Sequence, residues 1–391
     1  NFYNFIGIFI LVLLVYFFAL ELGGDKLLAL ATTAFVIGGY SIIYNKTLFY
    51  NDFNVYGRAM YPFVSSLAFF AYLILLTKAL KFLSFRSALF AGALFGLLFY
   101  IYFYAWTFAL AINGALFLIF IFKRDWLRIK TIFLVSAIGL LIGAYNILRI
   151  TLFMNSPAGE QFSYFSWSAR SRVPLFSNLS AAMLLPFGIF LYKNRRDANI
   201  PLFLAFILAG WISLNQQIVT GRLMQQNHDY WFFIVPVFIV MFFHILWSWL
   251  GQRTLKIITL ILVLAVVFLN TVVGQYRSFF MTLEPKLYEQ NYKHVLDVLN
   301  NDKNPGVVLA ADEWPAHLVS IYTSHDLFWH KFAALNDNSI NRIKDALFVH
   351  IYLNKEAKRD FAGYINKLTD NPAGDSYYRD LYQYLEGYWS G

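Results

Sequence analysis

Long apolar stretches separated by short polar connectors dominate the first 274 residues of the chain. Runs of 17 to 20 apolar residues recur there, and each is long enough to cross about 30 Å of hydrocarbon as a helix. One apolar stretch exceeds 30 residues, so we divide it near Tyr104-Ala105-Trp106 as a tight re-entry. The pattern predicts ten membrane spans, at about 4–21, 27–44, 62–79, 86–103, 105–122, 131–149, 179–192, 200–217, 231–249 and 255–273.

The pattern changes after about residue 286. Residues 288–299 are typical of an amphipathic helix, residues 300–306 of a turn, and residues 307–311 of a buried strand. A second strand is expected at 320–323, and the remainder is expected to be helical. We therefore predict a transmembrane domain at 1–274 and a small α/β or mostly helical domain at 275–391.

Composition agrees with a membrane protein. Hydrophobic residues make up 59% of the chain and charged residues 14%, against about 25% charged in an ordinary globular domain. The fold class is therefore a polytopic α-helical membrane protein. The absence of cysteine excludes disulfides, thiolate metal sites and thiol nucleophiles.

The net charge of +9 is unevenly distributed. Residues 1–274 carry 19 Lys and Arg against 7 Asp and Glu, or +12, whereas the remainder carries 12 against 15, or −3. The basic excess lies in short loops, which argues against nucleic-acid binding. With ten spans, all the basic connectors fall on one side, which the positive-inside rule makes cytoplasmic. They are Lys78/Lys81/Arg86, 123–130, 193–196 and Arg253/Lys256.

This topology places the C-terminal domain outside, on the extracytoplasmic face of what we expect to be a bacterial inner membrane. Residue 1 also falls outside. The chain starts at Asn1 without a basic leader. Because most bacterial inner-membrane enzymes of this kind begin inside, we expect at least one further span before Asn1.

Polar residues that could carry chemistry collect on the predicted outer face. Asp52, in the stretch Y-N-D-F-N-V-Y-G-R-A-M-Y-P, could act as a general base or hold a divalent cation such as Mg²⁺ or Mn²⁺. The alternative is an exposed loop residue that caps the helix start near Arg58. The candidate polar residues on the predicted outer face are Asp52, Arg58, Glu160, Arg170, Arg172, Arg222, His228 and Asp229.

Two later outer loops combine aromatic and polar residues. In residues 150–178, Arg170 and Arg172 could bind phosphate, or the segment could be an aromatic-belt loop whose arginines meet ordinary lipid headgroups. The second loop is N-Q-Q-I-V-T-G-R-L-M-Q-Q-N-H-D-Y-W-F, residues 215–232. There Arg222 offers a planar fork that suits phosphate or pyrophosphate.

The same loop offers a His-Asp pair and several amides. His228 donates a hydrogen bond when protonated, and Asp229 could orient it. Amides both donate and accept, so they suit hydroxyl-rich ligands; the candidates for sugar binding are Asn215, Gln216 and Gln217. The alternative is a polar turn with an internally satisfied His-Asp pair.

The C-terminal domain gives no comparable signal. His325 and His330 are five residues apart with no obvious third ligand, so we expect them to be polar residues at the domain surface rather than a metal site. The chain has no Gly-rich phosphate loop, H-E-x-x-H or G-x-S-x-G. Nucleotide, zinc-protease and serine-hydrolase chemistries therefore lack support.

The layout resembles the C-type (GT-C) glycosyltransferases, polytopic enzymes of the cell envelope that use polyprenyl-phosphate-linked sugars. Four features carry the resemblance: ten or more spans, an acidic early outer loop (Y-N-D-F-N-V-Y-G-R-A-M-Y-P), a compact re-entrant pair (A-G-A-L-F-G-L-L-F-Y-I-Y-F-Y-A-W-T-F), and a final outer domain with V-V-L-A-A after an amphipathic helix. It implies hexosyl or pentosyl transfer from the lipid phosphate to an acceptor.

The resemblance also implies roles. Residues 45–61 would be the second outer loop, with Asp52 as the assisting acid and the main base in sequence before Asn1. The family often has two acids in that loop and this chain has Asp52 alone, so a metal is not implied. Basic residues of the outer loops would hold the lipid phosphate, with Asp229 beside them: Arg58, Arg170, Arg172, Arg222 and His228.

Two other classes remain open. A lipid or polysaccharide transporter would place ionisable residues or Gly/Pro breaks at mid-membrane depth in paired halves, whereas here the ionisable residues collect at one face. A non-catalytic subunit of a membrane assembly would use the outer domain to contact a partner.

Overall fold

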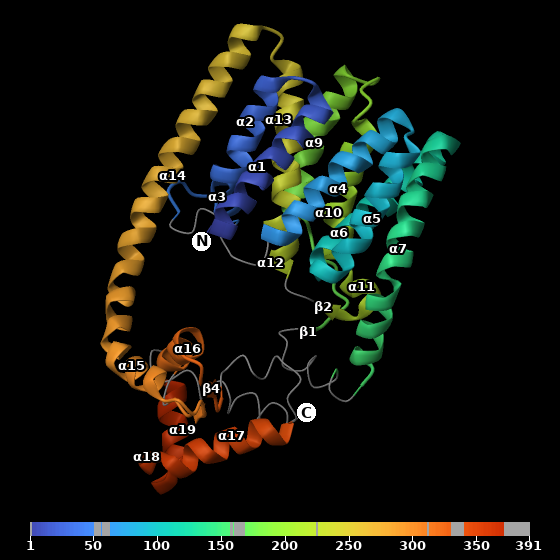
Figure 1. Cartoon of the computed structure of the whole chain (residues 1–391). Coiled ribbons are helices and arrows are strands. Elements are labelled where there is room, and N and C mark those ends of the chain that lie inside the picture. Colours follow the sequence, from blue (N-terminus) through green and yellow to red (C-terminus); the bar gives the residue numbers. More distant parts are fainter. Residues whose placement is uncertain are drawn as a thin grey trace. The chain divides into compact units, whose positions relative to one another are not determined.

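The computed structural model describes residues 2–50, 56, 63–156, 159, 169–223, 226–310, 313–329 and 340–370. It is 83% helical. The chain divides into two compact units, and we describe each by itself (Figure 1). Unit 1 comprises Asn1–Arg149 and Ala169–Phe280; unit 2 comprises Ile150–Ser168 and Met281–Gly391.

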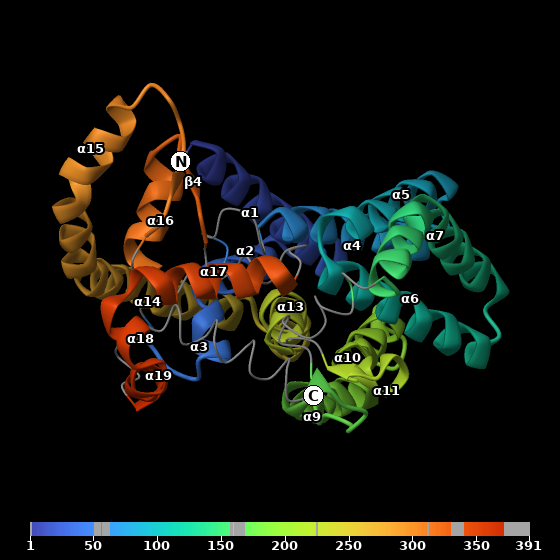
Figure 2. The same cartoon turned by 90° about the horizontal axis from the view of Figure 1, so that it is seen from below.

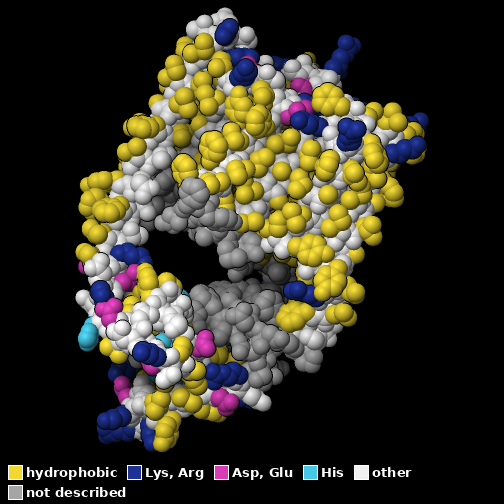
Figure 3. Space-filling model, viewed as in Figure 1, with side chains coloured by type: hydrophobic (Ala, Val, Ile, Leu, Met, Phe, Trp, Pro, Cys, Tyr) yellow, Lys and Arg dark blue, Asp and Glu magenta, His cyan; other side chains and the backbone are white. Residues whose placement is uncertain are grey.

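Unit 1 is a bundle of apolar helices with hydrophobic side chains over its sides (Figure 3). Seven helical segments in the described residues are long and apolar enough to cross a membrane. The helices are α1 (Phe2–Gly23), α2 (Lys26–Gly38), α3 (Tyr40–Tyr44), α4 (Phe63–Phe82), α5 (Phe85–Ile101), α6 (Phe103–Lys123), α7 (Trp126–Met154), α9 (Asn178–Lys193), α10 (Ile200–Leu214), α11 (Gln217–Thr220), α12 (Gln226–Asp229), η2 (Tyr230–Ile234), α13 (Val235–Trp249) and α14 (Arg253–Glu289), the last of which continues into unit 2.

The other three predicted spans coincide with shorter apolar helices. These are α2, α5 and α9, with 13, 17 and 16 residues. At 1.5 Å per residue, α2 is only about 20 Å long, and the chain bends at Gly39 before it continues as α3. The structure confirms an α-helical membrane protein, while ten complete crossings stay a prediction.

The predicted re-entry within the long apolar stretch occurs at a single residue. Tyr102, between α5 and α6, adopts φ −160° and ψ 129°, and its N–H still donates to the carbonyl of Leu98. The break therefore lies two residues before the predicted point at Tyr104. It leaves the Tyr102 side chain at the end of both helices.

Small residues allow α5 and α7 to approach closely, and the two helices lie side by side in both views (Figures 1 and 2). A Cβ atom added at Gly96 of α5 would lie 2.6 Å from Cβ of Ile142, and one added at Gly139 of α7 would lie 2.1 Å from Cδ1 of Phe95. Both distances are far below van der Waals contact. Gly-xxx-Gly spacing on each helix (92/96 and 139/143) is the usual way in which membrane helices pack.

One end of unit 1, which we call the connector end, carries the basic connectors and the turns α1–α2, α4–α5, α6–α7, α9–α10 and α13–α14. Lys and Arg side chains gather there (Figure 3). Acidic residues of these turns pair with the cations: Glu21 lies 3.9 Å from Lys81, and Asp125 lies 2.5 Å from Arg128. The first pair joins the α1–α2 turn to the α4–α5 turn, and the second lies within the α6–α7 turn.

Asp25 joins three elements at the connector end. Its Oδ1 accepts from the N–H groups of Leu27 and Leu28 and so caps α2, while Oδ2 accepts from Trp247 Nε1 at 2.9 Å and lies 3.4 Å from Lys256 Nζ. Burial raises the pKa of this carboxyl, but the hydrogen bonds and the ion pair outweigh burial and hold the pKa below its ordinary value.

Unit 2 is mostly helical: η3 (Gln290–Tyr292), α15 (Lys293–Asn301), α16 (Glu313–Tyr322), α17 (Ile340–Leu353), α18 (Lys355–Arg359) and α19 (Phe361–Asp370). The short strands β3 (Val307–Val308) and β4 (Asp326–Leu327) pair in parallel. The strand predicted at 307–311 is thus found at its first residues. The strand predicted at 320–323 is wrong, because α16 continues to Tyr322. Pro315 lies in the first turn of α16, where proline favours a helix.

Asp25→Ala should lower the stability of the folded protein by about 2 kcal/mol, because it removes a helix cap (about 1 kcal/mol) and the acceptor of a largely buried indole N–H (about 1 kcal/mol). Asp25→Asn should cost less, because asparagine also caps helices and the exposed part of the ion pair contributes little. Thermal unfolding of the full-length protein in detergent measures both. Equal melting temperatures for the two variants would contradict this role of Asp25.

Candidate functional site

A two-stranded ribbon brings together arginines from two distant loops. Strand β1 (Ala169–Arg170) pairs antiparallel with β2 (Arg222–Leu223), and the register places Arg170 directly opposite Arg222. Like charges at directly opposite positions destabilise a strand pair. An anion bound at this position would reverse that penalty, so the register favours an anion site. We call this end of unit 1 the ribbon end; it is the end opposite to the connector end.

Side chains of α10 and α11 hold the segment that follows β1. Asn215 Nδ2 donates to the carbonyls of Leu175 (3.0 Å) and Trp211 (2.8 Å), and Asn215 Oδ1 accepts from the N–H of Leu175 at 2.7 Å. Gln217 Nε2 donates to the carbonyl of Val173 at 3.0 Å. These amides therefore position the chain next to the ribbon.

The third amide of the set lies differently. Gln216 Oε1 accepts from the Thr220 hydroxyl on an exposed face. Sugar binding by Asn215, Gln216 and Gln217 stays a prediction, and for Asn215 and Gln217 it competes with the backbone contacts above.

Arg172 braces the turn that leads into β2. Its Nη1 donates to the carbonyl of Ile218 at 2.6 Å. Gly221 has φ +73°, a backbone conformation that residues with a side chain rarely adopt. A Cβ atom at this position would lie 3.3 Å from Nη2 of Arg172. Glycine thus allows both the left-handed turn and the close approach of the guanidinium.

His228 lies in an aromatic cluster. Its Nδ1 is 2.5 Å from the hydroxyl of Tyr102, and its ring lies 5.0 Å from that of Tyr104 and 5.3 Å from that of Phe232, measured between centroids. Tyr102 was not among the residues predicted for the site. The hydrogen bond that orients His228 thus comes from the α5–α6 break, and not from Asp229 as the adjacent His-Asp sequence suggested.

Asp229 is 5% exposed, and its Oδ1 has no hydrogen-bond partner among the described residues. Asp229 immediately precedes the apolar segment Tyr230–Trp249, and burial raises the pKa of its carboxyl well above the ordinary value. The turn that follows, η2, is a π-helix, a rare form that occurs frequently at functional sites.

Several other buried polar atoms at the ribbon end lack a hydrogen-bond partner in the described part of the chain. Each lies within about one turn of a helix end on this side of unit 1. With Asp229 Oδ1 they are Ser66 Oγ, Trp106 Nε1, Ser213 Oγ and Gln217 Oε1. Buried polar groups are nearly always satisfied, so these atoms point to water or a polar ligand at the ribbon end.

An apolar groove of about 200 Å³ runs along α13 between α2–α3 and α9. Its first residues, Ile43, Leu179 and Val235, lie at helix ends on the ribbon side, and Phe242 lies about two turns further along α13. Seen from below, α9 and α13 lie next to each other (Figure 2), and the two helices are in contact. The groove has the chemistry of a hydrocarbon-chain site.

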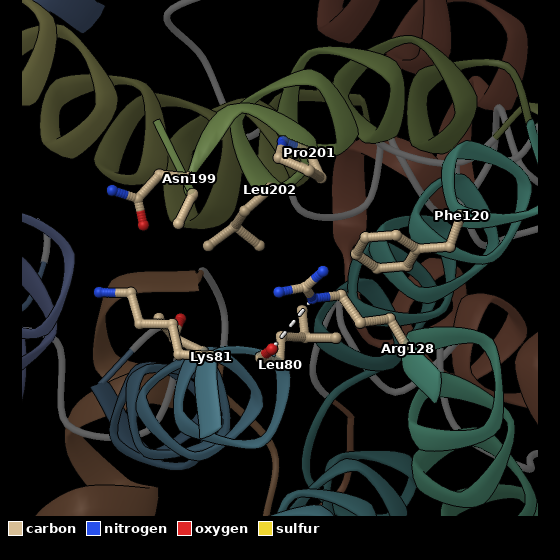
Figure 4. Close-up of a pocket in the computed structure, with 9 residues that line it drawn as sticks. Leu80, Lys81, Phe120, Arg128, Asn199, Pro201 and Leu202 are labelled. Atoms are coloured by element: carbon tan, nitrogen blue, oxygen red, sulfur yellow. Dashed lines mark hydrogen bonds between the residues drawn. The ribbon is translucent and has the colours of Figure 1, made fainter. Parts of the chain in front are cut away.

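A second cavity, which unlike the apolar groove is lined by charged side chains, lies at the connector end. There Lys81 of α4 and Arg128 of α7 approach α10 (Figure 4). Arg128 Nε donates to the carbonyl of Leu80 at 3.1 Å, and Arg128 also pairs with Asp125. The cavity offers about 20 Å³, room for roughly one water molecule. It is a structural junction rather than a substrate site.

Some predicted site residues cannot be placed. Asp52, Arg58 and Glu160 lie outside the described residues, as do the side chains of Arg170 and Arg222, whose backbone alone is described. Within the described ranges, no group of three or more His, Asp or Glu side chains could hold a metal ion. The predicted metal-binding role of Asp52 stays a prediction.

Comparisons with protein-family models, with curated proteins and with solved structures give no match for the chain. The class of the protein follows from its helices: it is an α-helical integral membrane protein. Its ribbon end combines facing arginine positions, a hydrogen-bonded histidine and a buried carboxyl that has no partner among the described residues.

Asn215→Ala should release the segment around Leu175 from the end of α10, because both hydrogen bonds between the Asn215 side chain and the Leu175 backbone are lost. Removing such partners costs about 1–3 kcal/mol, so amide exchange in a peptide covering 171–177 should accelerate about tenfold to a hundredfold. Hydrogen–deuterium exchange of the full-length protein measures this. Gln216→Ala, which removes an exposed contact with Thr220, is the matched control. Equal exchange rates in the two variants would contradict the role of Asn215 in holding this segment.

Proposed function

We propose that this protein is a membrane glycosyltransferase that transfers a hexosyl or pentosyl group from a polyprenyl-phosphate donor to an acceptor hydroxyl. The observation that carries the proposal is the register of β1 and β2, which sets Arg170 opposite Arg222. This is also the end of unit 1 where buried polar atoms have no partner in the part of the chain that the structure describes. A sugar phosphate supplies what both features need: an anion, and many hydroxyl groups.

The arginines suit the phosphate of the donor. A guanidinium presents paired N–H donors that match phosphate oxygens, and it keeps its charge at every physiological pH. When the sugar leaves, negative charge grows on the phosphate oxygen that it leaves behind. Donors already in place stabilise that charge at no reorganisation cost. Arg172 and His228 belong to the same region and would complete the anion site.

The apolar groove suits the polyprenyl chain. It begins at helix ends on the ribbon side, so a lipid whose phosphate meets the arginines could lay its first isoprene units between α2–α3 and α9. Moving the hydrocarbon chain from the bilayer into the groove gains little free energy, because both surroundings are apolar. The groove would therefore orient the donor rather than supply its affinity.

The proposed topology has ten crossings, with the connector end in the cytoplasm and the ribbon end on the extracytoplasmic face of a bacterial inner membrane. Its support is the charge of the turns. The connector end carries 13 Lys and Arg against four Asp and Glu, or +9, which is the asymmetry that the positive-inside rule describes. Sugar transfer would then take place outside the cytoplasm, where lipid-linked donors replace nucleotide sugars.

Arg222→Ala should lower sugar transfer at least a hundredfold, because losing one donor to a developing oxyanion typically costs 10²–10³ in rate. The assay uses the full-length protein in detergent with radiolabelled undecaprenyl phosphate mannose, glucose and arabinose as donors and a membrane extract as acceptor source. Arg195→Ala, a cation in a connector-end turn, is the control and should keep full activity.

Arg222→Lys separates charge from geometry. A lysine keeps the charge but not the paired donors, so we expect a loss between those of wild type and Arg222→Ala. Wild-type turnover with Arg222→Ala would remove the phosphate role of this residue, and the absence of transfer by the wild type from all three donors would contradict the proposed function.

A further inference from the structure

We infer that Asp229 is the catalytic base that takes the proton from the acceptor hydroxyl, an inference that rests on the proposed sugar transfer. The sequence resemblance assigns the acid-base role to Asp52 and to a residue outside this chain, and gives Asp229 only a place beside the phosphate. The structure instead singles out Asp229 among the acidic residues that it describes in unit 1.

Pairing distinguishes Asp229 from the other described carboxyls of unit 1. Glu21, Asp25, Asp125 and Asp197 all lie at the connector end, and each has a basic side chain within 4.0 Å: Lys81, Lys256, Arg128 and His244. Asp229 lies at the opposite end, is 5% exposed, and makes no ion pair among the described residues. Burying an ionised carboxylate without a partner costs folding free energy, unless a ligand supplies the missing hydrogen bonds.

The surroundings of Asp229 suit proton transfer. Helix α12 packs against α6, α10 and η2. The titratable residues that these elements bring to this end are Tyr104, Tyr230 and the neighbouring His228, with Tyr102 just before α6, while α10 has no charged residue at all. Burial raises the pKa of Asp229. A base whose pKa lies closer to the working pH accepts a proton more readily.

The local backbone and the neighbouring polar atoms support a reacting position. The π-turn η2 begins at Tyr230, directly after Asp229, and the N–H of Val235 donates to the carbonyl of Tyr230. Ser213 Oγ of α10, the helix that contacts α12, and Gln217 Oε1 of the following α11 are buried without partners in the described residues. Such groups would accept or donate hydrogen bonds to a hydroxyl-rich molecule that reaches Asp229.

The proposed step balances. The acceptor O–H gives its proton to Asp229 Oδ1 as the acceptor oxygen forms a bond to the anomeric carbon of the donor sugar. The bond between that carbon and the donor phosphate oxygen breaks, and its electron pair stays on the phosphate, which the arginines stabilise. The products are the glycoside, polyprenyl phosphate and protonated Asp229, which then releases its proton to water.

The test separates chemistry from binding in the full-length protein. With whichever undecaprenyl phosphate sugar the wild type uses, single-turnover rates and donor affinity are measured from pH 4.5 to 8.5 for wild type, Asp229→Asn and Asp229→Glu. General-base catalysis contributes about 10²–10⁴ in rate, so Asp229→Asn should lose at least a hundredfold while its donor affinity stays within threefold. Asp125→Asn, a paired carboxyl at the connector end, should match wild type.

The pH profile supplies a readout that a purely structural role would not move. The wild-type rate should rise with pH along an acid limb whose midpoint lies well above pH 4. Asp229→Glu should keep part of the rate with a shifted midpoint, and Asp229→Asn should lose the limb. If Asp229→Asn does not fold, the wild-type and Asp229→Glu profiles decide, and identical midpoints would overturn the inference.

The remaining outcomes separate this inference from the proposed function. Transfer by Asp229→Asn within threefold of wild type, or a loss of donor affinity in place of turnover, would overturn the role of Asp229 and leave sugar transfer standing. A wild-type protein that transfers from none of the lipid-phosphate sugars would contradict the proposed function, and the role of Asp229 with it.

Discussion

Hydrocarbon cannot hydrogen-bond, so a helix bundle in a membrane must satisfy its polar groups from within. The described carboxyl groups of unit 1 meet this constraint differently at its two ends. At the connector end the described acidic residues have partners, and Asp25 alone joins α2 to Trp247 and Lys256. At the ribbon end, buried polar atoms from four helical segments and Asp229 have no hydrogen-bond partner within the described ranges.

Magnitudes show why this difference matters. An unsatisfied buried polar group costs about 1–3 kcal/mol. Five of them would together cost about 5–15 kcal/mol, which is as much as the whole stability of a typical folded domain. Such atoms need hydrogen-bond partners beyond the described residues, and water or a polar ligand would supply them. The connector end is a structural junction, and the ribbon end is where we propose that a polar molecule binds.

Much of unit 1 could be predicted from the sequence, because apolar runs of spanning length report directly on the solvent around a helix. The break at Tyr102 was predicted two residues too late, since a run of aromatic residues contains no glycine or proline to mark it. In unit 2, the strand expected at 320–323 belongs to α16, because a short apolar run does not distinguish a strand from a buried helix.

The candidate site was harder to predict, since its parts come from separate loops. The sequence identified Arg170, Arg222, His228 and Asp229 as residue types suited to a phosphate sugar. It could not show that Arg170 faces Arg222, because a strand pair joining residues far apart leaves no local periodic signal. The role of Asn215 was equally hidden, since an amide binds a backbone as readily as a sugar.

The most direct test of the central claim is a cryo-EM structure of the full-length protein in lipid nanodiscs with undecaprenyl phosphate. We expect phosphate density between Arg170 and Arg222, within about 5 Å of both guanidinium groups, with the first isoprene units along α13. Phosphate density at the connector end beside Lys81 and Arg128, and none at the ribbon, would contradict it.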